Sequence, residues 1–309
     1  MSMRSFSFID PDGFEIFVYT WLPEITSGCK AVVQIAHGMN ETAERYERFA
    51  KALTANGYIV YANDHRGHGR SVKSAGDFGY IGEDGYTKMV ENMHQLNRLI
   101  QSEHPSLPIV LFGHSMGSFL AQTYISRYGS TVQGVILSGT NGKQSPMLHL
   151  GIYLAKQEMK KNGDKWKSER IRKLVFDPYN KPFAPNRTDF DWLTRDQQEV
   201  DAYIQNPCCG NHFPASFFYY FFKGLRDIHK SENLKKIPKD LPIYLFSGAK
   251  DPVGNCGKGV LQLASAYRTL GLKHVQYKLY PGGRHEMLNE INRDEVTRDV
   301  LKWLDEYCA

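Results

Sequence analysis

Short apolar runs alternate with longer amphipathic stretches along most of the chain. The runs lie at 31–36, 58–62, 109–112, 132–137 and 242–248 and are typical of strands buried on both faces of a sheet. A further segment, 274–280, alternates apolar and polar positions like a strand with one exposed face. Between the runs, 46–55 and 86–103 carry apolar residues at helical spacing. This order predicts a mostly parallel sheet covered by helices on both faces.

Two breaks interrupt the alternation. Residues 6–22 predict a hairpin that turns at 10–13, where Pro11 fixes φ and Gly13 supplies a positive φ. With the six later strands, the hairpin brings the expected sheet to about eight strands. The second break runs from about Asn141 to Leu241 and shows no convincing strand alternation.

Aromatic side chains are concentrated in this second break. Thirteen of the chain's 39 Phe, Tyr and Trp residues lie between Phe176 and Phe222. The run 217–222 has no polar face, so a helix there must be covered on most sides. So many aromatic rings must either pack on the core or line a cavity.

The clearest chemical motif is the sequence Gly113-His114-Ser115-Met116-Gly117. It follows the apolar run 109–112 and leads into a helical pattern, which is the strand-turn-helix setting of a nucleophile elbow. Small residues two positions either side of the serine allow the strand and helix to approach closely. We therefore expect Ser115 to be the catalytic nucleophile, with the backbone N–H of Met116 facing a developing oxyanion.

A serine nucleophile needs a base, and in elbow proteins an acid and then a histidine follow it in chain order. Asp251 lies just after the strand 242–248, at the sheet edge where open α/β sheets place their sites. His285 follows the strand 274–280 on a glycine-containing turn. The order Ser115, Asp251, His285 is the required one. The run 31–36 ends in His37-Gly38-Met39-Asn40, and its Met39 amide is expected to be the second oxyanion donor.

The motifs then identify a family resemblance that runs almost end to end. The chain resembles α/β-hydrolases of the monoacylglycerol lipase and lysophospholipase group, related to serine-aminopeptidase-like hydrolases. The matching residues are His37-Gly38-Met39, Glu41, Glu44-Arg45-Tyr46, 64–71, the elbow, Leu193-Thr194-Arg195, Glu199-Val200-Asp201, Tyr203, Asn206-Pro207, Gly248, Asp251 and Gly283-Arg284-His285-Glu286. One departure is Ser118, where many relatives carry a second glycine; serine is small enough for the elbow to survive.

The resemblance implies an α/β-hydrolase fold with a helical cap inserted after the strand that follows the elbow helix. We expect residues 143–226 to form this cap over Ser115, and residues 1–142 and 227–309 to form the core. The implied activity is hydrolysis of a single-acyl-chain ester, a monoacylglycerol or lysophospholipid, with no metal or organic cofactor.

Composition narrows the protein class. No apolar stretch of the 309 residues is long enough to span a bilayer, and the start lacks the features of a signal peptide. Five cysteines without framework spacing indicate a reducing cytoplasm. The net charge of +5 is concentrated between Lys156 and Lys173, where eight Lys or Arg accompany three acids. A solvated helical face is the plain interpretation, with peripheral contact with an anionic membrane as the alternative. No nucleic-acid-binding motif is present.

Other polar clusters have plainer interpretations. Asp64, His65 and His68 are only a weak signal for a metal site. The favoured interpretation is a loop rich in turn residues that braces the loop carrying the expected oxyanion donor Met39. Asp227 and His229 are a rival acid–base pair, but no strand precedes them. The remaining alternatives are a small-ester carboxylesterase, an aminopeptidase or amidase on the same triad, and a catalytically silent binding scaffold.

Overall fold

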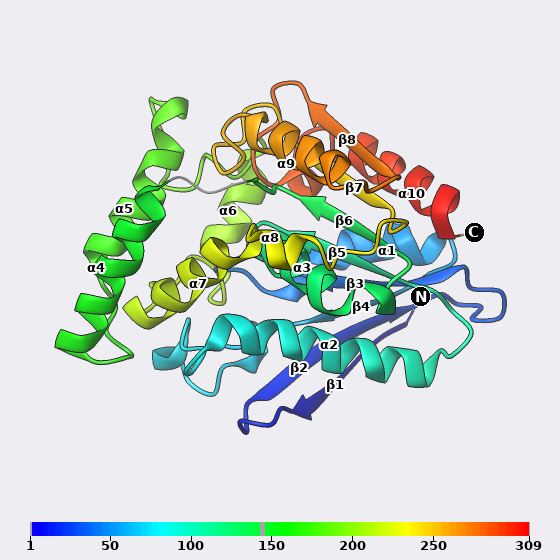
Figure 1. Ribbon diagram of the computed structural model, residues 1–309, viewed down its shortest axis with the longest axis horizontal. Helices are drawn as coiled ribbons and strands as arrows, with labels where there is room; N and C mark the ends of the chain where they lie inside the picture. The colour runs from blue at the N-terminus through cyan, green and yellow to red at the C-terminus, as the bar shows by residue number, and fades with distance from the viewer. Residues whose placement is uncertain (1, 143–145, 309) are drawn as a thin grey trace.

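The computed structural model describes residues 2–142 and 146–308. Their strands form one eight-stranded sheet (Figure 1). The strand order is β1-β2-β4-β3-β5-β6-β7-β8. The bounds are β1 Ser2–Ile9, β2 Glu15–Leu22, β3 Ala31–Ala36, β4 Tyr58–Asn63, β5 Ile109–His114, β6 Gly134–Ser138, β7 Ile243–Gly248 and β8 Val275–Tyr280. Antiparallel pairing is confined to β1–β2 and β2–β4, so the mostly parallel sheet predicted from the apolar runs is confirmed.

The central strands are buried throughout, as their unbroken apolar runs require. Val33 of β3 lies in register with Val60 of β4 and Val110 of β5, and all three are fully buried. Because β3 to β8 run parallel, their C-terminal ends meet at one edge of the sheet. That edge carries the loops with the expected chemistry.

Helices cover both faces of the sheet and divide the core in two. On one face lie α1 (Glu47–Ala55) and α10 (Arg293–Cys308), and on the other lie α2 (Gly85–Glu103), α3 (Met116–Tyr128) and α9 (Lys258–Thr269). Short 3-10 helices span Ala43–Tyr46, Gly69–Ser71, Ala75–Asp77, Gly129–Thr131, Lys181–Phe183 and Met287–Asn289. The N-terminal hairpin turns where predicted, with Gly13 at a φ of 78°.

Between β6 and β7 the described residues form helices and loops. These are α4 (Met147–Asn162), α5 (Glu169–Asn180), α6 (Gln197–Gln205), α7 (Ala215–Ile228) and α8 (Ser231–Leu234). In Figure 1, α4 and α5 lie at the left, beyond the C-terminal ends of the strands. We call the segment from α4 to α7 the helical insertion. Residues 143–145 of the expected cap lie outside the described residues.

The aromatic run predicted to be covered is the middle of α7. This helix packs on α4 on one side and on α2 and α3 on the other. Phe217, Phe218, Phe221 and Phe222 are buried, whereas Tyr219 and Tyr220 are half-buried. Across the described residues, no helix combines the length and apolar character needed to cross a membrane.

Candidate active site

Ser115 sits on a strained turn between β5 and α3. Its backbone has φ 51° and ψ −117°, a conformation that L-residues rarely adopt. A side chain at Gly113 would come within 2.5 Å of the Gly117 carbonyl oxygen, and a Cβ at Gly117 would overlap the Ala36 carbonyl. The two glycines are therefore required for the turn to form, and the turn leaves Ser115 partly exposed.

Asp251 and His285 meet at the same sheet edge although they are 34 residues apart. The Nδ1 atom of His285 lies 3.0 Å from Oδ1 of Asp251. The carboxylate also accepts the Ser247 hydroxyl at 2.7 Å and the Val253 backbone N–H at 2.9 Å. Both side chains of the pair are buried. These bonds orient the carboxylate toward the imidazole.

The charges of this pair shift both pKa values. Burial alone would raise the pKa of Asp251, but the facing His285 and the hydrogen bonds outweigh it, so the pKa lies below its usual value. Burial alone would lower the pKa of His285, and the Asp251 charge and hydrogen bond raise it above its usual value. The pair therefore favours an imidazolium beside an ionised carboxylate.

The loop after β3 lies against the elbow. A Cβ at Gly38 would lie 3.3 Å from the Ser115 Cβ, so this loop borders the serine. His37 holds the loop, because its Nδ1 is 2.7 Å from the Gly38 carbonyl while its Nε2 accepts the His65 backbone N–H at 3.0 Å. This bonding fixes the Nδ1–H tautomer, and burial lowers the pKa of His37 to about 4. Met39 and Met116 both line the cavity beside Ser115.

The loop containing Asp64, His65 and His68 contacts the loop that follows β3, residues 37–42, which we call the oxyanion loop after the donor role expected of Met39 from the sequence. The Asp64 carboxylate accepts the Thr42 hydroxyl at 2.9 Å and the Ala43 backbone N–H at 2.8 Å. Burial raises the pKa of Asp64 to about 6. Across the described part of the chain, no group of three or more His, Cys, Asp or Glu side chains is arranged to hold a metal ion.

A buried ion-pair network joins the oxyanion loop to the histidine loop, and sequence reasoning assigned it no role. Arg45 contacts Glu41 at 2.6 Å and makes two bonds of 2.7 Å to Glu286. Glu41 also accepts the Gly38 N–H at 2.5 Å and the Tyr46 hydroxyl at 2.9 Å. Glu41, Arg45 and Glu286 were visible only as residues that match the family. Glu41 and Arg45 are four positions apart, but the Arg45–Glu286 pair spans 241 positions and has no local signal.

The helical insertion contacts the oxyanion loop directly. Tyr203 donates its hydroxyl hydrogen to the Asn40 carbonyl at 2.9 Å, and the Gly210 N–H reaches the same oxygen at 3.1 Å. The Asn40 side-chain amide donates to the Asn211 carbonyl at 2.7 Å. Asn40 itself has a positive φ of 66°. The position of the insertion and the conformation of the oxyanion loop are therefore linked.

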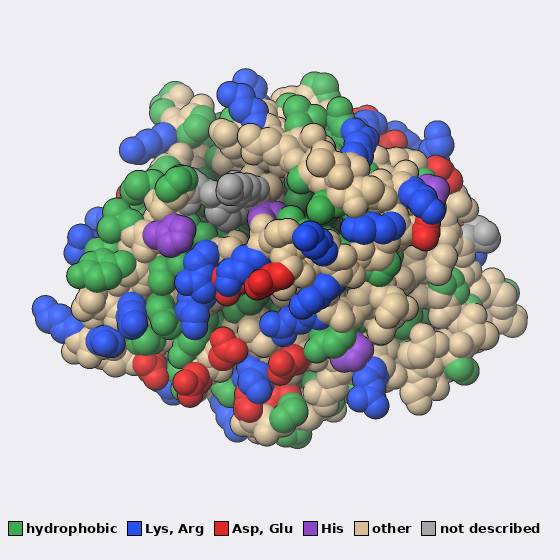
Figure 2. Space-filling model, viewed as in Figure 1, with side chains coloured by type: hydrophobic (Ala, Val, Ile, Leu, Met, Phe, Trp, Pro, Cys, Tyr) green, Lys and Arg blue, Asp and Glu red, His purple; other side chains and the backbone are tan. Residues whose placement is uncertain are grey.

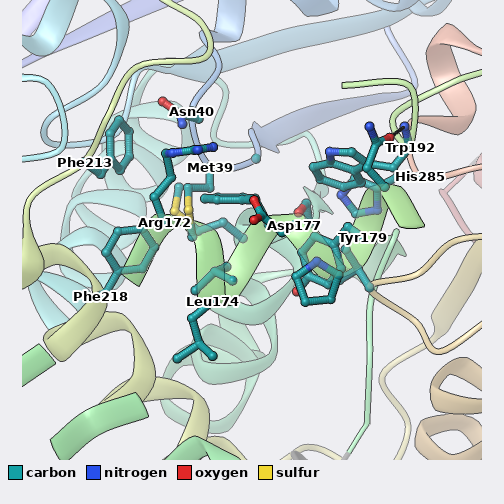
Figure 3. A pocket seen from close by; sticks show the side chains of 18 of the residues that line it. Met39, Asn40, Arg172, Leu174, Asp177, Tyr179, Trp192, Phe213, Phe218 and His285 are labelled. Carbon is teal, nitrogen blue, oxygen red and sulfur yellow. Dashed lines mark hydrogen bonds between the residues drawn. The ribbon is translucent and has the colours of Figure 1, made fainter. Parts of the chain in front are cut away.

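A cavity of about 1150 Å³ connects these elements. Ser115 and His285 line it from the core. The insertion supplies further lining residues, among them Arg172, Leu174 and Phe218, which are labelled in Figure 3. Apolar side chains contributed by α4 and α7 include Leu148, Leu150, Phe218, Phe221, Phe222 and Leu225. Polar lining residues include Asn40, Arg172, Asp177, Asp189, Asn211 and His212. One cavity therefore combines Ser115 and His285 with both apolar and polar walls.

The other sequence candidates lie in different surroundings. Asp227 is paired with Arg226 at 2.8 Å and with Lys230 at 3.0 Å near the end of α7. His114 packs on His285 with ring centroids 4.8 Å apart, and its Nδ1 lies 3.1 Å from the Ser138 hydroxyl. Cys256, five residues after Asp251, is exposed and donates its backbone N–H to the Asp251 carbonyl.

Comparisons with known proteins identify the family of the chain. The family model described as "Serine aminopeptidase, S33" matches residues 27–292. The chain belongs to this family. A monoacylglycerol lipase of Mycolicibacterium smegmatis is 30% identical, with 96% of this chain and 95% of that protein covered. The human monoglyceride lipase is 27% identical, with 97% and 90% covered.

Solved structures of related hydrolases have the same architecture as this S33-family hydrolase. A carboxyl esterase from Bacillus coagulans superimposes with a TM-score of 0.91 at 29% identity, covering all of both chains. A yeast monoglyceride lipase shares the fold with a TM-score of 0.76 at 20% identity, covering 100% of this chain and 96% of that one. The α/β-hydrolase fold expected from the sequence is confirmed, and the protein is a serine ester hydrolase.

Proposed function

We propose that the protein hydrolyses single-acyl-chain esters, monoacylglycerols or lysophospholipids, with Ser115 as nucleophile. The observation that carries this proposal is the cavity of about 1150 Å³ in which Ser115 and His285 face apolar side chains of the insertion. A volume of this size accommodates a ligand larger than a small ester. The similarity of the chain to the two lipases named above also supports the proposal.

In the proposed reaction, the Ser115 hydroxyl attacks the ester carbonyl while His285 removes its proton through Nε2. Asp251 keeps the proton of the neutral imidazole on Nδ1 and stabilises the imidazolium. The Met39 and Met116 amides donate to the oxyanion of the tetrahedral intermediate. His285 then protonates the departing alcohol, and water, deprotonated by His285, releases the carboxylic acid and restores Ser115.

We propose that residues 143–226, which include most of the helical insertion, form a cap subdomain that provides the acyl-chain site. Phe218 and Phe222 line the cavity from α7, and Leu148 and Leu150 line it from α4. Each methylene buried among such side chains contributes up to about 0.8 kcal/mol. The value of kcat/KM should therefore rise about twofold or more per carbon from acetyl to octanoyl esters, up to the fourfold that 0.8 kcal/mol allows.

A p-nitrophenyl ester series, run with Ser115→Ala and a fluorophosphonate probe, tests both parts. The alanine variant should lose turnover and labelling while keeping its circular dichroism spectrum. Turnover close to that of the unmodified protein would refute the nucleophile assignment. Equal kcat/KM for acetyl and octanoyl esters would instead refute the acyl site and favour a small-ester carboxylesterase.

An aminopeptidase is the second candidate, because the carboxylates of Asp177 and Asp189 line the cavity and are suited to a free amine. The description of the matching family as a serine aminopeptidase also supports this candidate. Aminoacyl anilides should be cleaved poorly compared with octanoyl esters. A reversed preference that is lost in Asp177→Asn would establish the aminopeptidase instead.

We further propose that α4 contacts anionic membranes peripherally. Its Met147, Leu150 and Tyr153 are exposed, and Lys160 and Lys161 lie in its last turn. Figure 2 shows hydrophobic and basic side chains close together at the left of the molecule, where α4 lies in Figure 1. Reversing charge at Lys160 and Lys161 should reduce sedimentation with anionic vesicles at low salt. The matched change at Lys235 and Lys236, after α8, should not. Equal recovery with neutral and anionic vesicles would refute the electrostatic part.

A further inference from the structure

Trp192 of the helical insertion lies directly on the imidazole of His285. The ring centroids are 5.0 Å apart and the planes are inclined by 36°. Trp192 is 7% exposed and His285 is 2% exposed, so little water reaches the contact. Figure 3 shows the two rings side by side at the edge of the cavity. The insertion therefore supplies an aromatic face to the proposed general base.

The surrounding backbone fixes this contact on both sides. The Glu286 N–H donates to the Leu193 carbonyl at 2.7 Å, and the Arg284 guanidinium donates to the Asp191 carbonyl. The two neighbours of His285 are thus bonded to the two neighbours of Trp192.

The indole is supported from behind as well. The Trp192 backbone N–H donates to Asn180 Oδ1 at 2.9 Å, and the ring centroids of Tyr179 and Trp192 are 5.1 Å apart. An indole held in this way keeps its face toward the imidazole.

The His285 imidazole has a second ring neighbour. His114 packs on His285, and a Cβ at Gly139 would come within 2.9 Å of the His285 Cε1 atom. Burial lowers the pKa of His114 to about 4, so this neighbour is neutral near pH 7. Among the described rings that contact His285, Trp192 is the one with a large apolar π-face. Indole faces attract cations within about 6 Å, and more strongly when water is excluded.

We propose that Trp192 is a positioning residue that orients the His285 imidazole and stabilises the imidazolium formed in each step of the reaction. This inference rests on the proposed role of His285 and assigns a second function to the insertion. The other titratable groups around the ring are Asp251 after β7, Glu286 beside it, Glu41 in the oxyanion loop and His114 at the end of β5. A substitution at Trp192 leaves all of these groups in place.

Removing the indole should destabilise the imidazolium and lower the pKa of His285. The acid limb of the kcat/KM profile should therefore move to lower pH in Trp192→Leu, by between about half a unit and about one and a half units. Trp192→Phe, which keeps a weaker π-face, should move it less, and kcat should fall about three- to tenfold in the leucine variant. A packing defect alone would lower kcat without moving the limb.

Tryptophan emission provides a readout without substrate, because a protonated imidazole quenches an adjacent indole. Emission of the unmodified protein should rise with pH through the midpoint of the acid limb. Trp166 has an exposed indole and provides the control. The rise should persist in Trp166→Phe and vanish in Trp192→Phe and His285→Asn.

An unmoved acid limb in both Trp192 variants, or an emission rise that survives Trp192→Phe, would overturn the inference. Full activity in Ser115→Ala would refute the proposed function instead, and the emission titration would still report on the ring contact. The two failures are therefore distinguishable.

Discussion

Arg45 lies between two buried carboxylates, and replacing it should strongly destabilise the protein. The exposed fractions of the side chains are 11% for Arg45, 4% for Glu41 and 6% for Glu286. Arg45→Met keeps an unbranched apolar side chain but leaves both carboxylates without their cation. Removing one partner of such a buried pair costs about 3–5 kcal/mol.

The pKa of Glu286 gives a second measure of the same interaction. Burial alone would raise it, but the Arg45 charge and hydrogen bonds lower it from 4.5 to about 2. That difference corresponds to about 3 kcal/mol of stability from the ionised carboxylate in its folded surroundings, of which Arg45 is the largest favourable part. Because the folded-state pKa is depressed, this contribution is complete above pH 4.5 and is lost as pH falls toward 2.

Urea unfolding followed by circular dichroism provides the measurement, with Arg48→Met as the matched control. Arg48 lies three positions along on α1 and pairs with Glu199, but its side chain is 47% exposed. The control should therefore lose at most about 1 kcal/mol. In Arg45→Met, the deficit in free energy of unfolding should be largest at pH 7 and should shrink at acidic pH, as Glu286 becomes protonated. A loss below about 1 kcal/mol at pH 7, equal to that of the control, would refute the network's role in stability.

Three further substitutions test the geometry of the site. Asp251→Asn should lower kcat by about four orders of magnitude, because the imidazole loses its orienting partner, whereas Asp227→Asn should stay within about twofold; a larger loss in the second variant would identify a different acid. Tyr203→Phe removes the hydroxyl that holds the oxyanion loop and should lower kcat about three- to tenfold at unchanged KM, less than the loss of an oxyanion donor itself; a change confined to KM would contradict this. Gly117→Ala places a methyl group on a backbone carbonyl and should prevent stable folding. Gly76→Ala, whose Cβ would meet the Ser74 hydroxyl oxygen at an ordinary contact distance of 3.7 Å, should unfold at nearly the same temperature as the unmodified protein; similar melting temperatures for both would contradict the close approach at the elbow.

The sequence by itself determined the order of the elements and the positions of the motifs. Buried parallel strands are short apolar runs, so β3 to β7 could be recognised without tertiary information. The elbow at Ser115 is equally local, since the spacing of its two glycines follows from the turn. The strands before Asp251 and His285 placed these residues at one sheet edge, because parallel strands end together.

The tertiary structure decided which distant side chains meet. The Arg45–Glu286 pair joins segments 241 positions apart, and no periodic pattern records such a contact. The aromatic residues of the insertion show the same limit, because Phe217 packs in the core while Phe218 also lines the cavity. Neighbouring residues with the same side chain received different surroundings from the way α7 is packed. The approach of Trp192 to His285 arises likewise from loops that are fixed only when the insertion closes over the sheet edge, because hydrogen bonds between the two loops depend on the completed fold.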